Sequence, residues 1–310
     1  MSDYQDYRKS LEARLWRYAK NSVPDSHREA GHPPPVFTRE SADENVLTDP
    51  DADDAVKQRV LRAIPPGRRH KWFRSMTSSQ ALAQSVFGNL RAYARLDLLQ
   101  GLCGDDGHPL FIRGAATCCL EHEVKGLEEP QPTSVDVFFA GEHQVAVECK
   151  LAEREIGPCS RPWWPKSTCR CDGAYVVRPE SECPDRCPLT AKRIRYWELI
   201  PELFEWRNDE DHQCCPLSST YQLVRNVLAA CLGPGGGIDA RRGRAVLLYD
   251  ERNPEFQPSG KGRKAWETVK CALKDPSLLQ QCTWQQVTAC LRADPELAWL
   301  TDGLCSKYGL

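Results

Sequence analysis

Two short apolar segments, residues 134–139 and 145–150, carry charged residues at spacings that suit metal-assisted chemistry. Side chains alternate between the two faces of a strand, so Glu148 and Lys150 project from the same face. Asp136 lies beside Glu148 if the two segments pair as a hairpin. Two carboxylates next to an ammonium group form a site for a divalent metal, and such a site is suited to phosphodiester hydrolysis. The alternative is an ordinary surface ion pair between Glu148 and Lys150.

The apolar pattern predicts the elements that must position these residues. Ser78 or Ser79 is the expected cap of a long helix that runs to about Leu99. A second helix is expected from Ser219 to Leu232. Strands are expected at 117–124, 133–139, 143–150 and 245–249. Flanking helices are expected at 3–20 and 51–63, and two or three more within 260–310.

This order divides the chain of 310 residues into three parts. Residues 1–75 form an N-terminal helical arm with an acidic loop, and residues 76–250 form an α/β core. A Cys-rich insertion at 151–218 interrupts that core. Residues 251–310 form C-terminal helices.

The element order and the residues Asp136 and Glu148-Cys149-Lys150 resemble the PD-(D/E)XK nuclease superfamily, with Val135 where the motif name has proline. More narrowly, the chain resembles a bacterial family of restriction endonucleases over roughly residues 75–250. The segments that carry the resemblance are 78–84, 135–150, 195–197 and 221–226. It implies a restriction-endonuclease-like α-β-β-β-α-β core with a mixed sheet.

The resemblance also implies an activity, namely a Mg²⁺-dependent DNA endonuclease of restriction or phage-defence type. Asp136 and Glu148 would bind Mg²⁺, with the Cys149 carbonyl oxygen as a third ligand. Lys150 would orient or activate the attacking water and offset charge on the phosphate. Nucleases that cut both strands are commonly dimers, so DNA and a second copy of the chain are the expected partners.

The expected first long helix lacks the glutamate that the superfamily often places there. Gln80, Gln84 or Asn89 can take that place, or Glu121 or Glu123 on the first strand can supply the carboxylate. We select Glu121 as the candidate catalytic residue.

The second helix offers polar side chains that can donate to phosphate. Gln222, Arg225 and Asn226 lie three or four residues apart and share a helical face. In some nucleases of the superfamily a glutamine on this helix borders the active site, so Gln222 is a further candidate. A solvated polar face is the alternative for all three residues.

Sixteen cysteines are a high count for a chain without a secretory leader, and a cytoplasmic location would keep them reduced. Clustered cysteines then indicate a metal site, holding Zn²⁺ or an iron–sulfur cluster. The expected ligands are Cys159, Cys171, Cys187 and Cys215, with Cys169, Cys183 and Cys214 in reserve. Unliganded thiols packed as small core residues are the alternative.

Charge and aromatic patterns give weaker signals. The formal net charge is −2, and no apolar run approaches the roughly 18 residues of a membrane span. The segment 59–95 has basic but no acidic residues, which indicates either a phosphate-contacting surface or a solvated helix. The aromatic and basic segments 161–166 and 192–197 would either grip a nucleic-acid strand or cover the cysteine site.

Two other functions fit the same residues. One is a nucleic-acid-binding protein with a degenerate nuclease core and structural zinc, which the missing helix glutamate favours and the intact Asp136, Glu148 and Lys150 oppose. The other is a RecB-like exonuclease with an iron–sulfur cluster. A brown colour on purification would support this second function.

Overall fold

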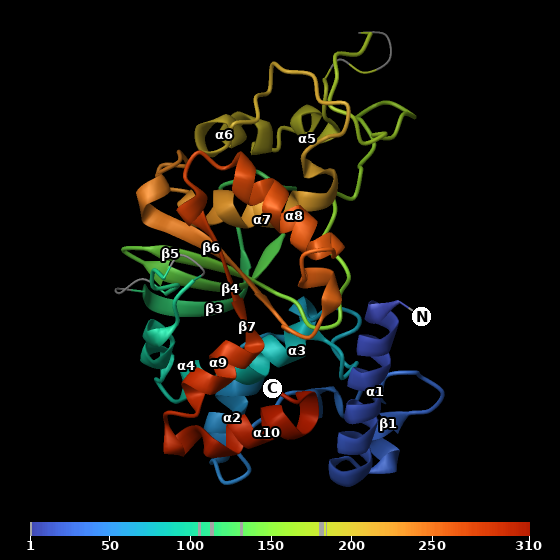
Figure 1. The fold of residues 1–310 in the computed structure, drawn as a ribbon, viewed down its shortest axis with the longest axis vertical. Coiled ribbons are helices and arrows are strands. Elements are labelled where there is room, and N and C mark those ends of the chain that lie inside the picture. Colours follow the sequence, from blue (N-terminus) through green and yellow to red (C-terminus); the bar gives the residue numbers. More distant parts are fainter. Residues whose placement is uncertain (1, 105–106, 112–114, 131–132, 180–182, 184) are drawn as a thin grey trace.

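The computed structural model describes residues 2–310 except 105–106, 112–114, 131–132, 180–182 and 184. Within these residues a five-stranded mixed sheet carries helices on both faces (Figure 1), which confirms the expected α/β class. The strand order is β3-β4-β5-β6-β7, antiparallel from β3 to β5 and parallel from β5 to β7. The strands are β3 Ala115–Glu123, β4 Ser134–Gly141, β5 Gln144–Cys149, β6 Gly243–Tyr249 and β7 Leu279–Thr283.

Four of these strands lie where the sequence predicts them, because β-branched and aromatic residues alternate there between turn signals. The fifth, β7, was not predicted and lies in the region where only helices were expected. Its sequence, Leu-Gln-Gln-Cys-Thr, has little intrinsic strand preference. It forms because the edge of β6 offers a parallel ladder, from Ala245 opposite Leu279 to Tyr249 opposite Thr283.

Parallel neighbours need a crossover, and helices supply both. α7 (Leu217–Cys231) connects β5 to β6, and α8 (Lys261–Ala272) connects β6 to β7 on the same face. The opposite face is covered by α3 (Ser79–Ala83), α4 (Asn89–Ala92) and α9 (Trp284–Leu291). The remaining helices are α1 Asp3–Ser22, α2 Asp54–Leu61, α5 Pro188–Ala191, α6 Tyr196–Leu203 and α10 Ala298–Tyr308, and β1 (Arg28–Glu29) pairs with β2 (Val36–Phe37).

The first long helix begins as predicted but ends early. The Ser78 side chain accepts a hydrogen bond from Ala81 N and caps α3. The helix continues through a π-helical turn at Gln84–Gly88 into α4 and stops at Ala92. The expected end near Leu99 is wrong, because Ala94 adopts a left-handed φ of 55°. The apolar spacing continues past this break into a 3₁₀ turn, Leu96–Gly101, so it did not reveal the break.

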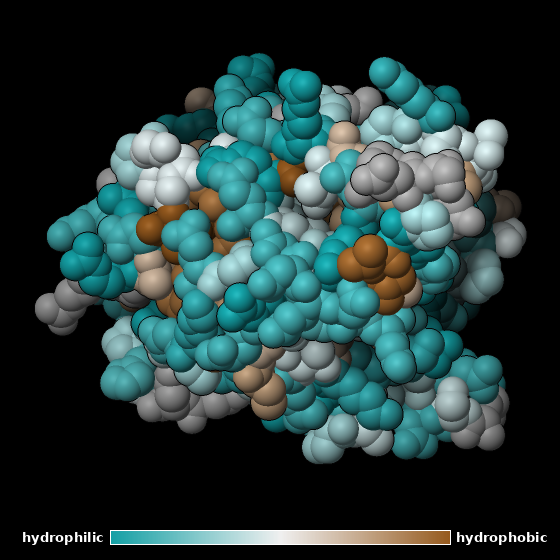
Figure 2. All heavy atoms as spheres, turned by 90° about the horizontal axis from the view of Figure 1, so that it is seen from above, coloured by the Kyte–Doolittle hydropathy of each residue, from teal (hydrophilic) through white to brown (hydrophobic). Residues whose placement is uncertain are grey.

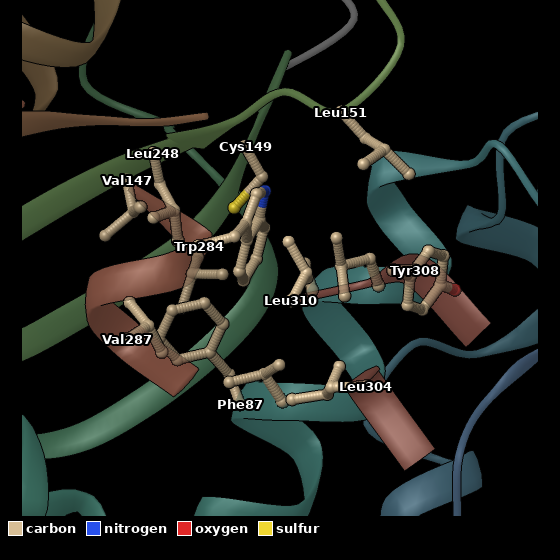
Figure 3. Packing of buried hydrophobic residues seen from close by; sticks show 14 of the residues in the cluster. Phe87, Val147, Cys149, Leu151, Leu248, Trp284, Val287, Leu304, Tyr308 and Leu310 are labelled. Atoms are coloured by element: carbon tan, nitrogen blue, oxygen red, sulfur yellow. The ribbon is translucent and has the colours of Figure 1, made fainter. Parts of the chain in front are cut away.

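The core on the α3, α9 and α10 side of the sheet surrounds Trp284 (Figure 3). Val147 and Cys149 enter it from β5, as the strand alternation predicts, and the Phe87 ring lies 6.2 Å from that of Trp284. The other face of the sheet packs on α7 and α8. β5 is therefore buried on both faces, and Glu148 points toward α7 rather than into water.

Outside the core the surface is mostly hydrophilic, as Figure 2 shows for the face that carries α5 and α6. None of the helices in the described residues combines the length and apolar character needed to cross a lipid bilayer.

Lys307 of α10 is fully buried, and the part of the chain that the structure describes gives it no carboxylate partner. Its Nζ donates to the backbone and side-chain oxygens of Asn45 at 2.6 and 2.8 Å, and lies over the rings of Tyr18, Phe37 and Tyr308. Burial lowers the pKa of Lys307 to about 7.

Lys307→Met gives a pH-dependent change in stability. The pKa of Lys307 is lower in the folded chain than the unfolded value of about 10.4, so the unfolded chain binds the extra proton between those values. We expect the free energy of unfolding of the wild type, relative to Lys307→Met, to rise from pH ~7 to ~10 by up to about 1.4 kcal/mol per pH unit. Urea denaturation across that range measures it, with the exposed Lys264→Met as control. A flat difference for Lys307→Met would contradict a buried lysine of lowered pKa.

Candidate active site

Three neighbouring strands each place one carboxylate at the same level of the sheet. Val137 pairs with Leu120 on one side and with Val147 on the other. The next position of the register sets Asp136 between Glu121 of β3 and Glu148 of β5. The hairpin expected from the sequence therefore brings the two carboxylates side by side.

Asp136 lines a cavity but is otherwise enclosed by protein. Its Oδ2 accepts a hydrogen bond from Cys149 N at 2.7 Å. Burial, followed by the negative charge of Glu148, raises the pKa of Asp136 well above its ordinary value, although the charge of Lys150 opposes this. A bound divalent cation would relieve the repulsion between these two carboxylates, and carboxylate oxygens are the ligands that a hard cation prefers.

Lys150 is 7% exposed, and its side chain contacts residues of both β5 and α7. Its Nζ donates to Glu148 Oε1 at 2.7 Å and to Gln222 Oε1 at 3.1 Å. Burial alone would lower the pKa of Lys150, but the charges of Glu148, Glu153 and Asp136 outweigh it and raise that pKa. The ammonium group therefore stays protonated at neutral pH, which suits charge stabilisation better than proton abstraction.

The backbone of Lys150 is fixed from two sides. Its N–H donates to Leu248 O of β6 at 2.7 Å, and its carbonyl accepts from Trp284 Nε1 of α9 at 3.0 Å. No local sequence pattern indicates that Trp284 supports the site, because the contact joins residues 134 positions apart.

The polar face of α7 holds Glu148. Asn226 Nδ2 donates to Glu148 Oε2 at 2.8 Å, and Arg225 Nη2 lies 3.6 Å from the same oxygen. Both Arg225 and Asn226 are 1% exposed, so the alternative of a solvated face is wrong for these two residues. Asn226 supports a carboxylate here, whereas the sequence analysis assigned it a phosphate contact. Within the described residues, Arg225 Nη1 is buried without a hydrogen-bond partner.

Glu121 is also buried, while Glu123 pairs with Arg68 at the surface. Gln80 Nε2 donates to Glu121 Oε1 at 2.6 Å, and Ser134 Oγ donates to Oε2. Burial raises the pKa of Glu121 against these two hydrogen bonds, and the charge of Glu148 adds to the rise. The φ of Glu121, 50°, is strained for a side chain within a strand, and such strain is common at functional sites.

Of the three amides considered on the first helix, only Gln80 contacts one of these carboxylates. Gln84 donates to the carbonyls of Val60 and Leu61, and Asn89 to those of Leu47 and Ser85.

A cavity of about 700 Å³ opens over these residues. Glu153, which the sequence analysis missed, also lines it and accepts from Ser79 Oγ at 2.6 Å. Among the described residues Glu148 does not line the cavity itself, but it contacts Lys150, which does. The cavity is lined on the sheet side by Glu121, Asp136, Lys150, Gln222 and Arg225, and on the side of the N-terminal arm by His32, Pro33, Pro34, Val36, His70 and Trp72.

The predicted cysteine ligands gather elsewhere. Cys159, Cys171, Cys187 and Cys215 lie close enough to interact electrostatically, and burial raises the pKa values of Cys187 and Cys215 to about 11 and 12. Of the reserve candidates, Cys169 and Cys214 are exposed and Cys183 is buried. In the part of the chain that the structure describes, no three His, Cys, Asp or Glu side chains form a preformed metal site.

Comparison with known proteins assigns the chain to a family. The family model REase-ARP, described as a restriction endonuclease associating with ARP, matches residues 13–309. The chain belongs to this family. Membership of REase-ARP supports a nuclease, and it makes DNA the implied substrate. No curated protein and no solved structure matches the chain.

Asp136→Asn is expected to stabilise the REase-ARP chain in the presence of a chelator. The amide removes a buried negative charge and still accepts the hydrogen bond from Cys149 N. The pKa of Asp136 is higher in the folded chain, so the wild type loses stability as pH rises above the unfolded value of about 4. We expect a gain on the order of 1–3 kcal/mol near pH 8 and a smaller gain near pH 5.

Urea denaturation at the two pH values measures this gain. The exposed Asp302→Asn serves as a matched control that should change neither value. A loss of stability in Asp136→Asn at both pH values would show that Asp136 is not under electrostatic stress.

Proposed function

We propose that this REase-ARP chain is a metal-dependent DNA endonuclease of restriction or phage-defence type, with a PD-(D/E)XK active site. The observation that carries the proposal is the meeting of Asp136 and Glu148, from neighbouring strands, beside the Lys150 ammonium group. The site borders a cavity of about 700 Å³ that Asp136 and Lys150 both line. Supporting evidence is the element order, in which α3 and α4 precede β3, β4 and β5, and α7 leads to β6.

The residues fit Mg²⁺, which takes oxygen ligands and commonly needs only one or two carboxylates from the protein. Asp136 and Glu148 would hold it, with the carbonyl of Cys149 as a further oxygen. The cations Lys150 and Arg225 lie against the carboxylates Glu121, Asp136 and Glu148, and burial together with the charge of Glu148 raises the pKa values of Asp136 and Glu121. When bound, the metal polarises the phosphate and lowers the pKa of a water ligand.

The protein's own cations have separate tasks in this proposal. Lys150 remains protonated, so its ammonium group orients the attacking water and offsets the charge that develops on the phosphate. Arg225 borders the cavity with a buried Nη1 for which the described residues provide no acceptor. A phosphate oxygen would satisfy that donor. Gln222 holds Lys150 through its Oε1 and positions the ammonium group.

The arm side of the cavity suits the substrate's bases and sugars. Trp72 is 56% exposed and lines the cavity, next to His70 and Pro34. An exposed indole beside a phosphate site offers a stacking surface. The expected phosphate-contacting function of the segment 59–95 receives less support, because Arg69 pairs with Asp43 and Arg74 with Glu29.

Cleavage of supercoiled plasmid in Mg²⁺ or Mn²⁺ tests the proposal. We expect nicking or linearisation by the wild type and a loss of at least ~100-fold in Asp136→Ala and Lys150→Ala, because each removes charge stabilisation at the reacting phosphate. Glu123→Gln is the matched control, since Glu123 lies outside the cavity on the same strand as Glu121. Unaltered DNA binding without cleavage of any substrate would instead support a binding protein with a degenerate nuclease core.

Trp72→Ala is expected to weaken DNA binding by about 1–3 kcal/mol through loss of one stacking surface. Anisotropy of a labelled duplex, measured in the Lys150→Ala background, reports the affinity without cleavage. Trp163→Ala is the control, because Trp163 is equally exposed at 54% but does not line the cavity. A larger effect of Trp163→Ala would move the DNA-binding surface to the Cys-rich segment.

The family description suggests one partner, ARP, and we extend that association to this chain as part of the proposal. Cutting both strands of a duplex would further require two active sites, which a homodimer supplies.

A further inference from the structure

Four cysteines of residues 151–218, the Cys-rich segment, approach one another from separate turns. The thiol of Cys187 interacts with those of Cys159 and Cys171, and the thiol of Cys215 interacts with all three. These four are distant in sequence, so the fold itself brings them together. The segment extends past α7 and α8 (Figure 1), and its described residues are mostly loops around the short helices α5 and α6.

Gly173 N donates to Cys171 Sγ at 3.4 Å, from two residues further along the chain. Burial raises the pKa values of Cys159, Cys187 and Cys215, and the backbone N–H groups of Arg161, Leu189 and Leu217, again two residues further along, oppose that rise. An N–H directed at sulfur stabilises the thiolate form, which is the form that binds metals. The same local arrangement recurs beside thiols that come from separate turns and interact with one another, and this recurrence supports a common ligand.

Backbone hydrogen bonds tie three of these turns into one unit. Cys215 N donates to Gly173 O at 2.6 Å, and Cys171 N donates to Pro162 O at 3.3 Å. Cys159 N donates to Ser218 O at 3.2 Å. The turns that carry Cys159, Cys171 and Cys215 are therefore held in fixed relation without any contribution from the sulfurs.

We propose that Cys159, Cys171, Cys187 and Cys215 bind one structural Zn²⁺ ion. Four thiolates complete a tetrahedral shell and leave no open position, which is the arrangement of structural rather than catalytic zinc. Because no three thiols are preformed as a metal site in the described residues, zinc binding has to draw the four sulfurs inward. The binding energy would then contribute directly to folding of the segment.

The zinc site has a consequence for the candidate active site. Cys215 and Ser218 lie at the start of α7, and Cys159 follows Gly157, whose carbonyl accepts from Gln222 N at 3.3 Å. A Cβ at Gly157 would lie 1.9 Å from Gln222 Oε1, so loop and helix are in close contact there. The metal would join the loop that leaves Lys150 to the helix that supplies Gln222.

Metal analysis of the full chain tests the zinc site independently of any cleavage activity. We expect one zinc per chain in the wild type and loss of that zinc in Cys171→Ser and Cys215→Ser. Cys169→Ser and Cys214→Ser are matched controls, because these exposed neighbours should leave the zinc content unchanged. Cys171→His replaces one zinc ligand by another and should retain the metal.

Cobalt substitution of the wild type provides a readout that does not depend on the folding of a variant. Tetrahedral Co²⁺ bound by four thiolates gives intense visible bands and a sulfur-to-metal charge-transfer band, and we expect both. The proposal is overturned if the wild type holds no zinc, if it holds iron and sulfide instead, or if Cys171→Ser and Cys215→Ser retain zinc.

Discussion

The constraint on which the site depends is the burial of Glu148 between the sheet and α7. At 1% exposure, its carboxylate has to find every partner within the protein. Lys150 satisfies one oxygen and Asn226 the other, with Arg225 close behind. Removing one partner of such a buried pair typically costs about 3–5 kcal/mol, because the charge left behind has no water. This requirement explains why the buried face of α7 carries polar residues. It also explains why hydrogen bonds hold the backbone of Lys150 in place.

Sequence patterns were sufficient for the centre of the site. Period-two alternation in residues 134–150 placed Asp136, Glu148 and Lys150 together, and helical spacing placed Gln222 on the facing helix. Which glutamate joins them was a choice between Glu121 and Glu123, and Glu121 was selected. The alternation rule could not decide it, because both lie on one face of an ideal strand. The left-handed backbone at Glu121 and its contact with Gln80 separate them in space.

Other features depended on contacts between distant parts of the chain. The strand β7 exists because β6 has a free edge, and Trp284 reaches Lys150 from a helix that follows this strand. The early end of the first helix was hidden by apolar residues that continue into the next turn. Basic residues such as Arg69 suggested a phosphate-binding surface, but Asp43 from the preceding loop neutralises it. A local sequence pattern indicates which secondary structure a segment favours, but not which residues from distant parts of the chain pack against it.

The position of Trp284 also sets an order on assembly during synthesis. The residue that fixes the carbonyl of Lys150, the strand β7 and the helix α10 all follow β6 in the chain, so they are made after the candidate catalytic residues. A nascent chain that has extended only through β6 already contains every candidate catalytic side chain, yet it lacks the indole that holds Lys150 in place. The ribosome therefore completes the chemical groups before it adds the residue that fixes their geometry, and the site can mature only once α9 has been made.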